Sequence, residues 1–234
     1  KGDKQMMRKI IGKIIDIVLP PKGQEQASKE APPPTTEVKA VSLEQLLGGA
    51  LGDAPAEPDL RVIGLYSSVE DEKIAELTQA LLYLNEMNRL LPEGKEKKPV
   101  EFYINTYGGS ADDMFAMYDV MQQVMEETEI HTIGVGKVMS AGTLLLAAGT
   151  KGKRKIGKNC RVMIHNVAAG NFGNLPNLAN ELEAIQRLQE DYISAMVENT
   201  KFTRKKLEKL LNEKVNIYLD ADEAVKYGLA DEIM

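Results

Sequence analysis

Ser140 and His165 are the two residues of this 234-residue chain whose types and placement best fit nucleophilic catalysis. Ser140 stands at a predicted tight turn, between an apolar strand at residues 130–135 and an apolar run at residues 143–148 that predicts a buried helix. The free N–H groups and the dipole at a helix N-terminus favour negative charge, so this position suits an attacking oxygen and an oxyanion. His165 closes another apolar strand, residues 161–165. A serine that opens a helix is also the usual N-cap, and this alternative stays open from the sequence.

The segments around these residues alternate between strand and helix patterns. Strands are predicted at residues 60–66, 99–105, 130–136 and 161–165, and helices at residues 70–91, 111–127, 176–199 and 203–211. Such alternation indicates an α/β domain with a mainly parallel sheet covered by helices. In these sheets the chemistry takes place at the carboxyl ends of the strands, where residues 105–109, Ser140 and His165 all fall. A predicted capping box of Asp220 and Glu223 opens one more short helix.

Three segments resemble the proteolytic subunit of the Clp protease, the ClpP family. The family's serine and histidine segment has its counterpart in residues 136–165, GKVMSAGTLLLAAGTKGKRKIGKNCRVMIH. Its glycine-rich oxyanion loop and following helix resemble residues 104–121, INTYGGSADDMFAMYDVM, and its C-terminal signature resembles residues 218–233, YLDADEAVKYGLADEI. The resemblance covers residues 60–234. It implies a ClpP/crotonase-like α/β fold with a mainly parallel sheet, helices and a protruding handle helix at residues 176–199.

The resemblance also implies roles for individual residues. Ser140 would be the nucleophile and His165 its general base, while the backbone N–H groups of Gly108 and Ala141 would form the oxyanion hole. Glycine suits the oxyanion loop because, without a Cβ, its backbone can approach a substrate carbonyl closely. Substrate binding is expected at Gly109, Ala169 and Gly170.

The third catalytic residue is where the chain departs from the family pattern, because the position of the family's aspartate is assigned to Asn212. An amide oxygen can accept from the imidazole N–H and fix its tautomer, but it cannot stabilise imidazolium with a full charge, so a slower enzyme is expected. Glu213, Asp220 and Asp222 are possible substitutes, although the last two fit helix caps better. Two further departures are Tyr107 in place of proline and NVAAG, residues 166–170, in place of polar-Pro-Leu-Gly-Gly.

Composition excludes several classes of protein. The net charge of −6 does not point to nucleic acid, and two histidines with one cysteine, without metal-ligand spacing, argue against a zinc site. The single cysteine, Cys160, excludes an intrachain disulfide framework, fits a cytoplasmic location and is better explained as a buried small hydrophobe than as a nucleophile. No phosphate-binding loop matches, so no cofactor is expected, and any ATP would be used by a separate ATPase.

Residues 1–59 have no counterpart in the family and are predicted to be an N-terminal extension. Residues 1–20 predict a short basic amphipathic helix, and residues 20–59 a Pro-rich linker. The helix could dock on a membrane surface or a partner, or it could pack on its own domain or a neighbouring subunit, and these alternatives stay open. Residues 6–19 are too short and too often interrupted by charge to span a membrane.

Together these patterns predict a serine endopeptidase subunit of the ClpP type. The resemblance implies two stacked seven-membered rings, an ATPase unfoldase of the AAA+ class as partner, and unfolded polypeptide as substrate. The helix at residues 176–199 would join the rings. Two alternatives are a non-catalytic ring subunit and a phage-type maturation or self-processing protease on the same fold. Crotonase-type acyl-CoA chemistry is disfavoured because that chemistry does not need the Ser140 and His165 pair.

Overall fold

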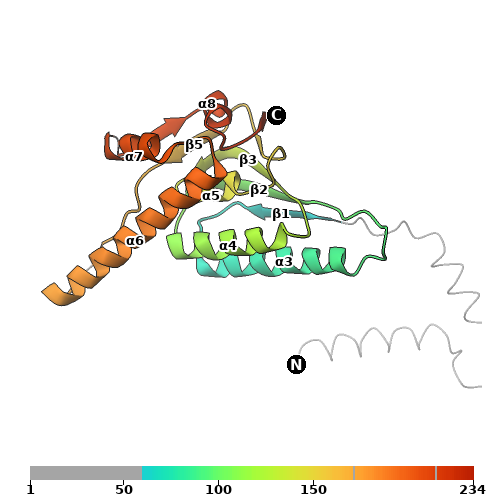
Figure 1. The fold of residues 1–234 in the computed structure, drawn as a ribbon, viewed down its shortest axis with the longest axis horizontal. Coiled ribbons are helices and arrows are strands. Elements are labelled where there is room, and N and C mark those ends of the chain that lie inside the picture. Colours follow the sequence, from blue (N-terminus) through green and yellow to red (C-terminus); the bar gives the residue numbers. More distant parts are fainter. Residues whose placement is uncertain (1–59, 171, 214) are drawn as a thin grey trace, which may run out of the picture. The chain divides into compact units, whose positions relative to one another are not determined.

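A parallel sheet lies at the centre of the computed structural model, which describes residues 60–170, 172–213 and 215–234 (Figure 1). The hypotheses on the N-terminal extension, its helix and its linker lie outside the described residues. The sheet order is β1-β2-β3-β4-β7, all parallel. These strands are β1 (Val62–Leu65), β2 (Val100–Thr106), β3 (Ile130–Met139), β4 (Lys155–Ile156) and β7 (Glu232–Ile233). The predicted α/β class with a mainly parallel sheet is confirmed.

Two further strands extend the sheet beside the carboxyl half of β3. β5 (Arg161–Ile164) pairs with β3 in parallel, and β6 (Ile217–Leu219) pairs with β5 antiparallel. The first half of β3 pairs with β4 instead, so β3 changes partner along its length. Gly136, with φ of 66°, lies at this change, where the register with β2 also shifts. The strand predicted at residues 130–135 therefore ends later than expected, because it contains a bulge and runs on to Met139. The tight turn predicted at Ser140 is present, as the single residue that joins β3 to α5.

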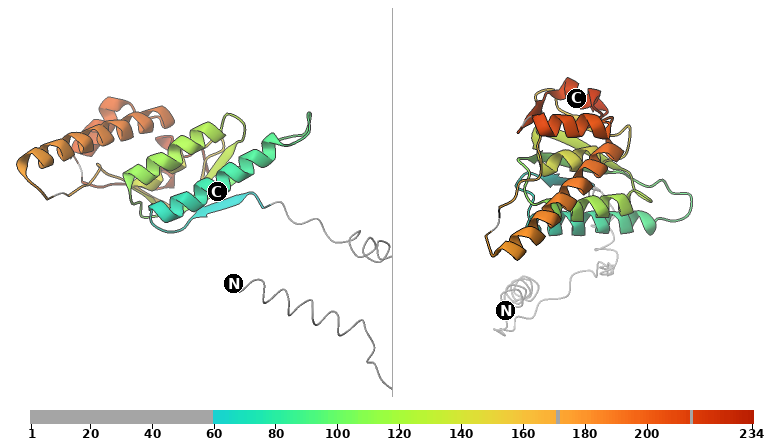
Figure 2. Two further views of the ribbon diagram at one scale, coloured as in Figure 1. Left: turned by 90° about the horizontal axis from the view of Figure 1, so that it is seen from below. Right: turned by 60° about the vertical axis from the view of Figure 1, so that its left-hand side comes forward.

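Helices α3 (Asp71–Arg89) and α4 (Ala111–Val124) lie side by side against one face of the sheet (Figures 1 and 2). The apolar stripe predicted on the first helix is buried in α3, and the methionine stripe predicted as core on the second is buried in α4. These side chains pack against β-strand residues such as Phe102 and Ile104, which are fully buried. The core thus fixes the strand ends that carry the candidate site.

Helix α5 (Ala141–Ala147) is buried along its whole length, whereas α6 (Leu175–Asn199) is buried only near its C-terminal end. The N-terminal half of α6 extends away from the rest of the domain in Figure 1 and in the left view of Figure 2. Leucines are exposed there, with Leu178 at 37% and Leu182 at 57% exposure. This is the geometry predicted for a protruding helix.

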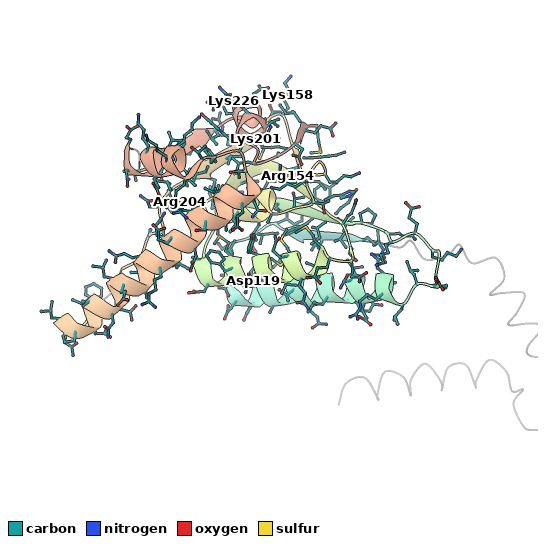
Figure 3. The ribbon with its side chains drawn as sticks, in the orientation of Figure 1. Asp119, Arg154, Lys158, Lys201, Arg204 and Lys226 are labelled. Carbon is teal, nitrogen blue, oxygen red and sulfur yellow. The ribbon has the colours of Figure 1, made fainter. Side chains whose placement is uncertain are left out.

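The C-terminal segment packs α7 (Arg204–Glu213) and α8 (Ala221–Lys226) near the buried end of α6. Figure 3 labels Arg204, whose guanidinium bonds Glu190 Oε2 at 2.8 Å and Ser194 Oγ at 2.7 Å, and so ties α7 to α6. The predicted capping box of α8 is confirmed: Asp220 Oδ1 accepts from the N–H of Glu223, and Glu223 Oε2 accepts from the N–H of Asp220.

Candidate active site

Ser140 joins β3 directly to α5 in a strained conformation, with φ of 54° and ψ of −123°. Among the described residues it alone has a positive φ without being glycine. A non-glycine residue in a sparsely populated region costs about 1–3 kcal/mol, which the surrounding structure must sustain. A strained serine between strand and helix is the geometry of a nucleophile elbow, although Val138 stands where that motif has its first glycine. The second glycine of that motif is present as Gly142, where a Cβ would lie 2.5 Å from Thr106 Cγ2.

The hydroxyl of Ser140 does not cap the helix that it opens. Its side chain makes no capping hydrogen bond, and its Oγ lies 2.8 Å from Nε2 of His165. The N-cap alternative therefore does not describe this serine. With Nε2 unprotonated, the serine O–H donates to the imidazole, which is the arrangement needed for proton transfer from an attacking hydroxyl.

The glycine loop after β2 lies against Ser140. A Cβ built on Gly108, whose φ is 99°, would lie 2.5 Å from Ser140 Cβ and 2.8 Å from the carbonyl oxygen of Met139, so only glycine fits. The N–H of Gly108 donates to Thr106 Oγ1 at 3.0 Å, and its carbonyl accepts from the N–H of Val69 at 2.9 Å. Both polar groups of this glycine thus have partners inside the protein.

Two other N–H groups beside Ser140 remain open to a ligand. Within the described ranges, no acceptor is recorded for the N–H of Gly109 or for that of Ala141, the first residue of α5. Both residues line the cleft that contains Ser140. Gly109 is also confined by the backbone, because a Cβ there would lie 2.1 Å from the carbonyl oxygen of Val69. The structure therefore offers Gly109, rather than Gly108, as the second donor next to Ala141.

His165 follows β5 directly, and its cross-strand neighbour can be read from the register. β5 and β6 pair Ile164 with Ile217, so the next position in this antiparallel register sets His165 opposite Asn216. Directly opposite residues point to the same face of a sheet, with Cβ atoms about 4.5–5.5 Å apart. Asn216 was missed from the sequence. The strand that follows it has only three residues, too few to reveal this pairing from the sequence.

Asn212 lies elsewhere, exposed in the last turn of α7. Across the described residues, no hydrogen bond joins it to His165. Of the substitutes considered, Asp220 is occupied as the cap of α8, and Glu213 lies 3.7 Å from Lys209. The structure thus does not bring Asn212 to the imidazole, and its role stays a prediction without a contact to support it.

A cleft of about 800 Å³ opens in front of Ser140 and His165. Its walls come from the start of α4, from residues 166–169 and from α6. Of the residues expected to bind substrate, Gly109 and Ala169 line this cleft, whereas Gly170 does not. Its charged lining is mostly acidic and consists of Asp112, Glu181, Glu183, Asp191 and Arg187. Arg187 is paired with Glu183 at 2.5 Å.

The segment after His165 is held by α6 and α7. Val167, at the position where the family has proline, has a backbone N–H that donates to Gln189 Oε1 of α6 at 2.7 Å. Asn166 Nδ2 donates to the carbonyl oxygen of Leu211 in α7 at 3.0 Å. Unlike proline, Val167 has a backbone N–H that needs an acceptor, and Gln189 of α6 supplies it. Gln189 Nε2 itself is buried without a partner among the described residues.

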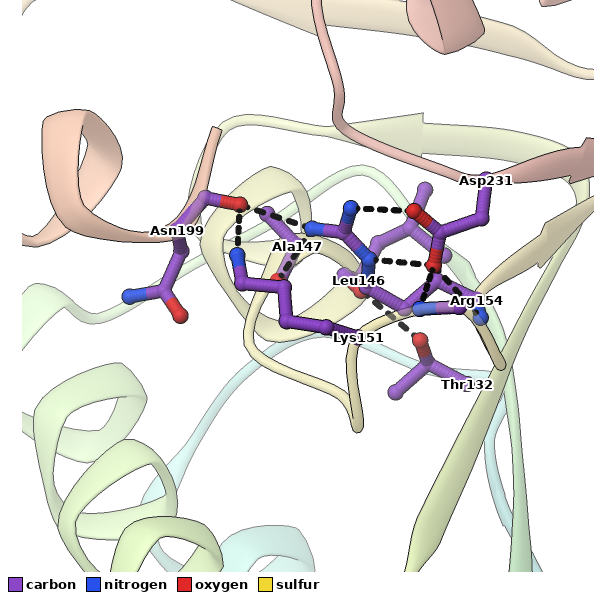
Figure 4. A network of polar contacts seen from close by, with 8 residues as sticks. Thr132, Leu146, Ala147, Lys151, Arg154, Asn199 and Asp231 are labelled. Atoms are coloured by element: carbon purple, nitrogen blue, oxygen red, sulfur yellow. Dashed lines mark hydrogen bonds and ion pairs between the residues drawn. The ribbon is translucent and has the colours of Figure 1, made fainter. Parts of the chain in front are cut away.

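The far end of α5 is fixed by Arg154, as Figure 4 shows. Its Nη1 donates to the carbonyl oxygens of Ala147 at 2.9 Å and Asn199 at 2.7 Å, so it caps α5 and α6 together. Its Nε and Nη2 bind the carboxylate of Asp231 at 2.8 and 2.6 Å. These hydrogen bonds hold the pKa of Asp231 down to about 2. Lys151 also donates to Asn199, and its burial lowers the pKa of its ammonium to about 8.

Other chemistries find little support in the part of the chain that the structure covers. Burial raises the pKa of the Cys160 thiol to about 11, and the residue is 2% exposed, which confirms its interpretation as a small buried hydrophobe. No group of His, Cys, Asp and Glu residues in the described ranges could hold a metal ion. Of the helices described, none combines the length and the apolar character that crossing a membrane requires.

Ser140 is hydrogen-bonded to His165 at the carboxyl ends of parallel strands, and two open N–H groups lie beside it. This arrangement places the chain among the serine hydrolases. Comparison with known proteins makes the class specific. The model of the Clp protease family matches residues 58–234. The ATP-dependent Clp protease proteolytic subunit of Deinococcus radiodurans is 33% identical over 174 residues, which cover 74% of this chain and 80% of that relative. The chain therefore belongs to the Clp protease family and is a serine-type endopeptidase, as the sequence predicted.

Proposed function

We propose that the chain is the proteolytic subunit of a ring-shaped, ATPase-assisted complex that degrades unfolded polypeptides. The observation that carries the catalytic part is the distance of 2.8 Å between Ser140 Oγ and His165 Nε2, at the edge of a cleft of about 800 Å³. A cleft lined partly by backbone suits an extended peptide, because main-chain groups can pair without regard to side chains.

In the proposed reaction, Ser140 Oγ attacks the carbonyl carbon of the scissile peptide bond while its proton passes to His165 Nε2. The carbonyl oxygen becomes an oxyanion and accepts from the N–H groups of Gly109 and Ala141. His165 then gives the proton to the departing amine, and an acyl-enzyme remains on Ser140. Water, activated by the same imidazole, releases the acyl group and restores the serine. Gly108 contributes by close approach rather than by donation, since its N–H already serves Thr106.

We further propose that Asn216 orients His165 in place of the family's aspartate. The cross-strand register supports it, whereas Asn212 lies on α7, outside this pair of strands. Both asparagines are exposed, and among the described residues no hydrogen bond to His165 is recorded for either, so the register alone favours Asn216. An amide oxygen can accept from the second imidazole N–H and select the tautomer with a free Nε2. Because it is neutral, it stabilises the imidazolium less than a carboxylate would.

Assembly into rings is proposed from the exposed half of α6. Leu175, Leu178 and Leu182 stand out on a helix that leaves the domain, and leucines in such a position favour burial against a second copy. The number of subunits and the ATPase partner follow from the resemblance alone and stay predictions. A cytoplasmic location, which the single cysteine also fits, stays a prediction as well. The alternative of a non-catalytic ring subunit is disfavoured by the hydrogen-bonded Ser140 and His165 pair.

A fluorophosphonate probe tests the catalytic part. We expect one adduct on Ser140 of the full chain by intact mass and peptide mapping, and no adduct on Ser140→Ala. A fluorogenic peptide should be hydrolysed by the wild type and not by Ser140→Ala or His165→Ala. A wild type that neither labels nor hydrolyses peptide would support the non-catalytic alternative. Cleavage confined to the chain's own N-terminal extension would support a self-processing protease.

A further inference from the structure

Helix α6 reaches the nucleophile through two buried hydroxyl groups. Tyr192 of α6 is 4% exposed and Thr143 of α5 is fully buried. Their side-chain oxygens lie 3.0 Å apart, and Thr143 Oγ1 donates to the carbonyl oxygen of Ser140 at 2.7 Å. A threonine hydroxyl has a single proton, and here it is used on Ser140. Tyr192 must therefore be the donor to Thr143, and the chain of hydrogen bonds runs from α6 to the serine backbone.

The same chain controls the direction of a neighbouring N–H. The carbonyl of Ser140 and the N–H of Ala141 belong to one planar trans peptide, so they point in opposite directions. Thr143 holds that carbonyl twice, through its backbone N–H at 2.9 Å and through its hydroxyl. With the carbonyl turned into α5, the N–H of Ala141 is turned outward, and Ala141 lines the cleft.

We propose that Tyr192 and Thr143 are positioning residues that aim the N–H of Ala141 at the oxyanion. The inference rests on the proposed function, since it assigns a support to the oxyanion hole of that same site. The strain at Ser140 gives the reason for such a support. A backbone with φ of 54° persists only where surrounding contacts hold it, and each bond to its carbonyl opposes rotation of the peptide plane.

The environment of Tyr192 suits a permanent donor. Burial raises the pKa of its phenol to about 12, against the smaller opposing effect of the hydrogen bond with Thr143, so the hydroxyl keeps its proton at neutral pH. Its ring also packs in the core and lines the cleft, and a purely structural role for the ring would leave the hydroxyl dispensable. Removal of the oxygen alone separates these two roles.

Four variants of the full chain test the proposal, with kcat and KM measured on a fluorogenic peptide. Loss of an entire oxyanion donor lowers kcat by about 10²–10³-fold, so misdirecting a donor that is still present should lower it less, by about tenfold in Tyr192→Phe. Thr143→Val should lower kcat by at least as much, and the double variant should be no slower than Thr143→Val, because both residues act through one chain of bonds. Thr143→Ser keeps the hydroxyl and should retain activity close to that of the wild type. KM should stay within about twofold throughout, because the oxyanion forms only after binding.

A transition-state analogue and a matched control sharpen the test. A peptide aldehyde, which forms an oxyanion on Ser140, should lose affinity for Tyr192→Phe by the same factor as kcat/KM falls, while binding of a product peptide is unchanged. The control is Tyr118→Phe, which removes a phenol that accepts from Asn199 Nδ2 of α6 at 2.9 Å without reaching Ser140. Its kcat should equal that of the wild type.

Wild-type kcat and aldehyde affinity in Tyr192→Phe would overturn the inference and leave the proposed function intact. Additive losses in the double variant, or equal losses of aldehyde and product binding, would also overturn it in favour of a structural role. Failure of the proposed function looks different, because the wild type itself would then neither label with fluorophosphonate nor hydrolyse peptide. Thermal unfolding of each variant identifies one that has lost its fold. If Thr143→Val has lost its fold, the kcat values of Tyr192→Phe and Thr143→Ser still test the positioning role.

Discussion

Replacing Asn216 by aspartate is expected to make the enzyme faster, because it gives His165 a charged neighbour. The last recorded pair of β5 and β6 is Ile164 and Ile217, and the next position of this register puts His165 opposite Asn216. Residues in such opposite positions have Cβ atoms about 4.5–5.5 Å apart. A carboxylate about 5 Å from an imidazolium interacts by about 3 kcal/mol at an effective dielectric of 20, and by about 1 kcal/mol in water. Asn216 is exposed and His165 is half-buried, so we take about 1–1.5 kcal/mol, which corresponds to about a tenfold rise in kcat.

The assay is the pH dependence of kcat/KM for a fluorogenic peptide. In Asn216→Asp the plateau should rise and the acid limb should move to higher pH by about one unit, because the carboxylate favours the protonated imidazole. Asn216→Ala should lower kcat without moving the acid limb far, since it removes the acceptor that selects the tautomer.

Asn212→Asp is the matched control, because it makes the same chemical change on the exposed end of α7. It should leave both the plateau and the acid limb where they are. The opposite result, in which Asn212→Asp moves the limb and Asn216→Asp does not, would return the role to Asn212. If neither variant changes the profile, the reaction needs no third residue and the argument from register is refuted.

Three further predictions concern stability, assembly and specificity. Arg154 holds the pKa of Asp231 down to about 2, so this pair adds stability above about pH 4 that is lost as the pH falls toward 2. Asp231→Asn should therefore lower the free energy of unfolding at pH 7 by about 1–2 kcal/mol, after allowance for solvent screening. Urea titrations that show the same acid dependence in both proteins would contradict this prediction. Leu182→Glu, on the exposed half of α6, should reduce the mass of the oligomer seen by light scattering, and an unchanged mass would argue against α6 as the contact. The mostly acidic lining of the cleft should favour peptides with lysine or arginine over glutamate near the scissile bond by about threefold to tenfold at low salt, and a preference that does not fall with added salt would exclude a charge effect.

The long elements could be predicted from the sequence because their periodicity is strong. The apolar stripe of α3, the methionine stripe of α4 and the alternation in β2 all follow from side chains that must be buried on one side. The short strands β4, β6 and β7 have two or three residues each, which is too few for any pattern to emerge. Their positions depend on which strand edge is free to pair, and this is a property of the whole sheet.

The same limit explains the details of the site. The pairing of Ser140 and His165 could be anticipated because each follows a strand in a parallel sheet. Whether Gly108 or Gly109 has an open N–H depends on the hydroxyl of Thr106, and nothing in the spacing of two adjacent glycines indicates that bond. The nucleophile elbow at Ser140 could not be predicted, because Val138 stands where the G-x-S-x-G motif has its first glycine. The strained backbone conformation belongs to Ser140 itself and leaves no other mark on the sequence.

Helix α6 joins assembly and chemistry on one rigid element. Its exposed leucines lie in the N-terminal half, whereas Gln189 and Tyr192 lie toward the other end. Gln189 accepts from the segment after His165, and Tyr192 bonds Thr143, which donates to the carbonyl oxygen of Ser140. With a rise of about 1.5 Å per residue, Leu182 is only about 15 Å from Tyr192 along the axis. A continuous helix transmits a tilt along its length, so a contact that fixes the exposed half also fixes the Gln189 acceptor and the Tyr192 donor at the buried half. The geometry of the oxyanion hole therefore depends on the same helix that we propose for contact between subunits.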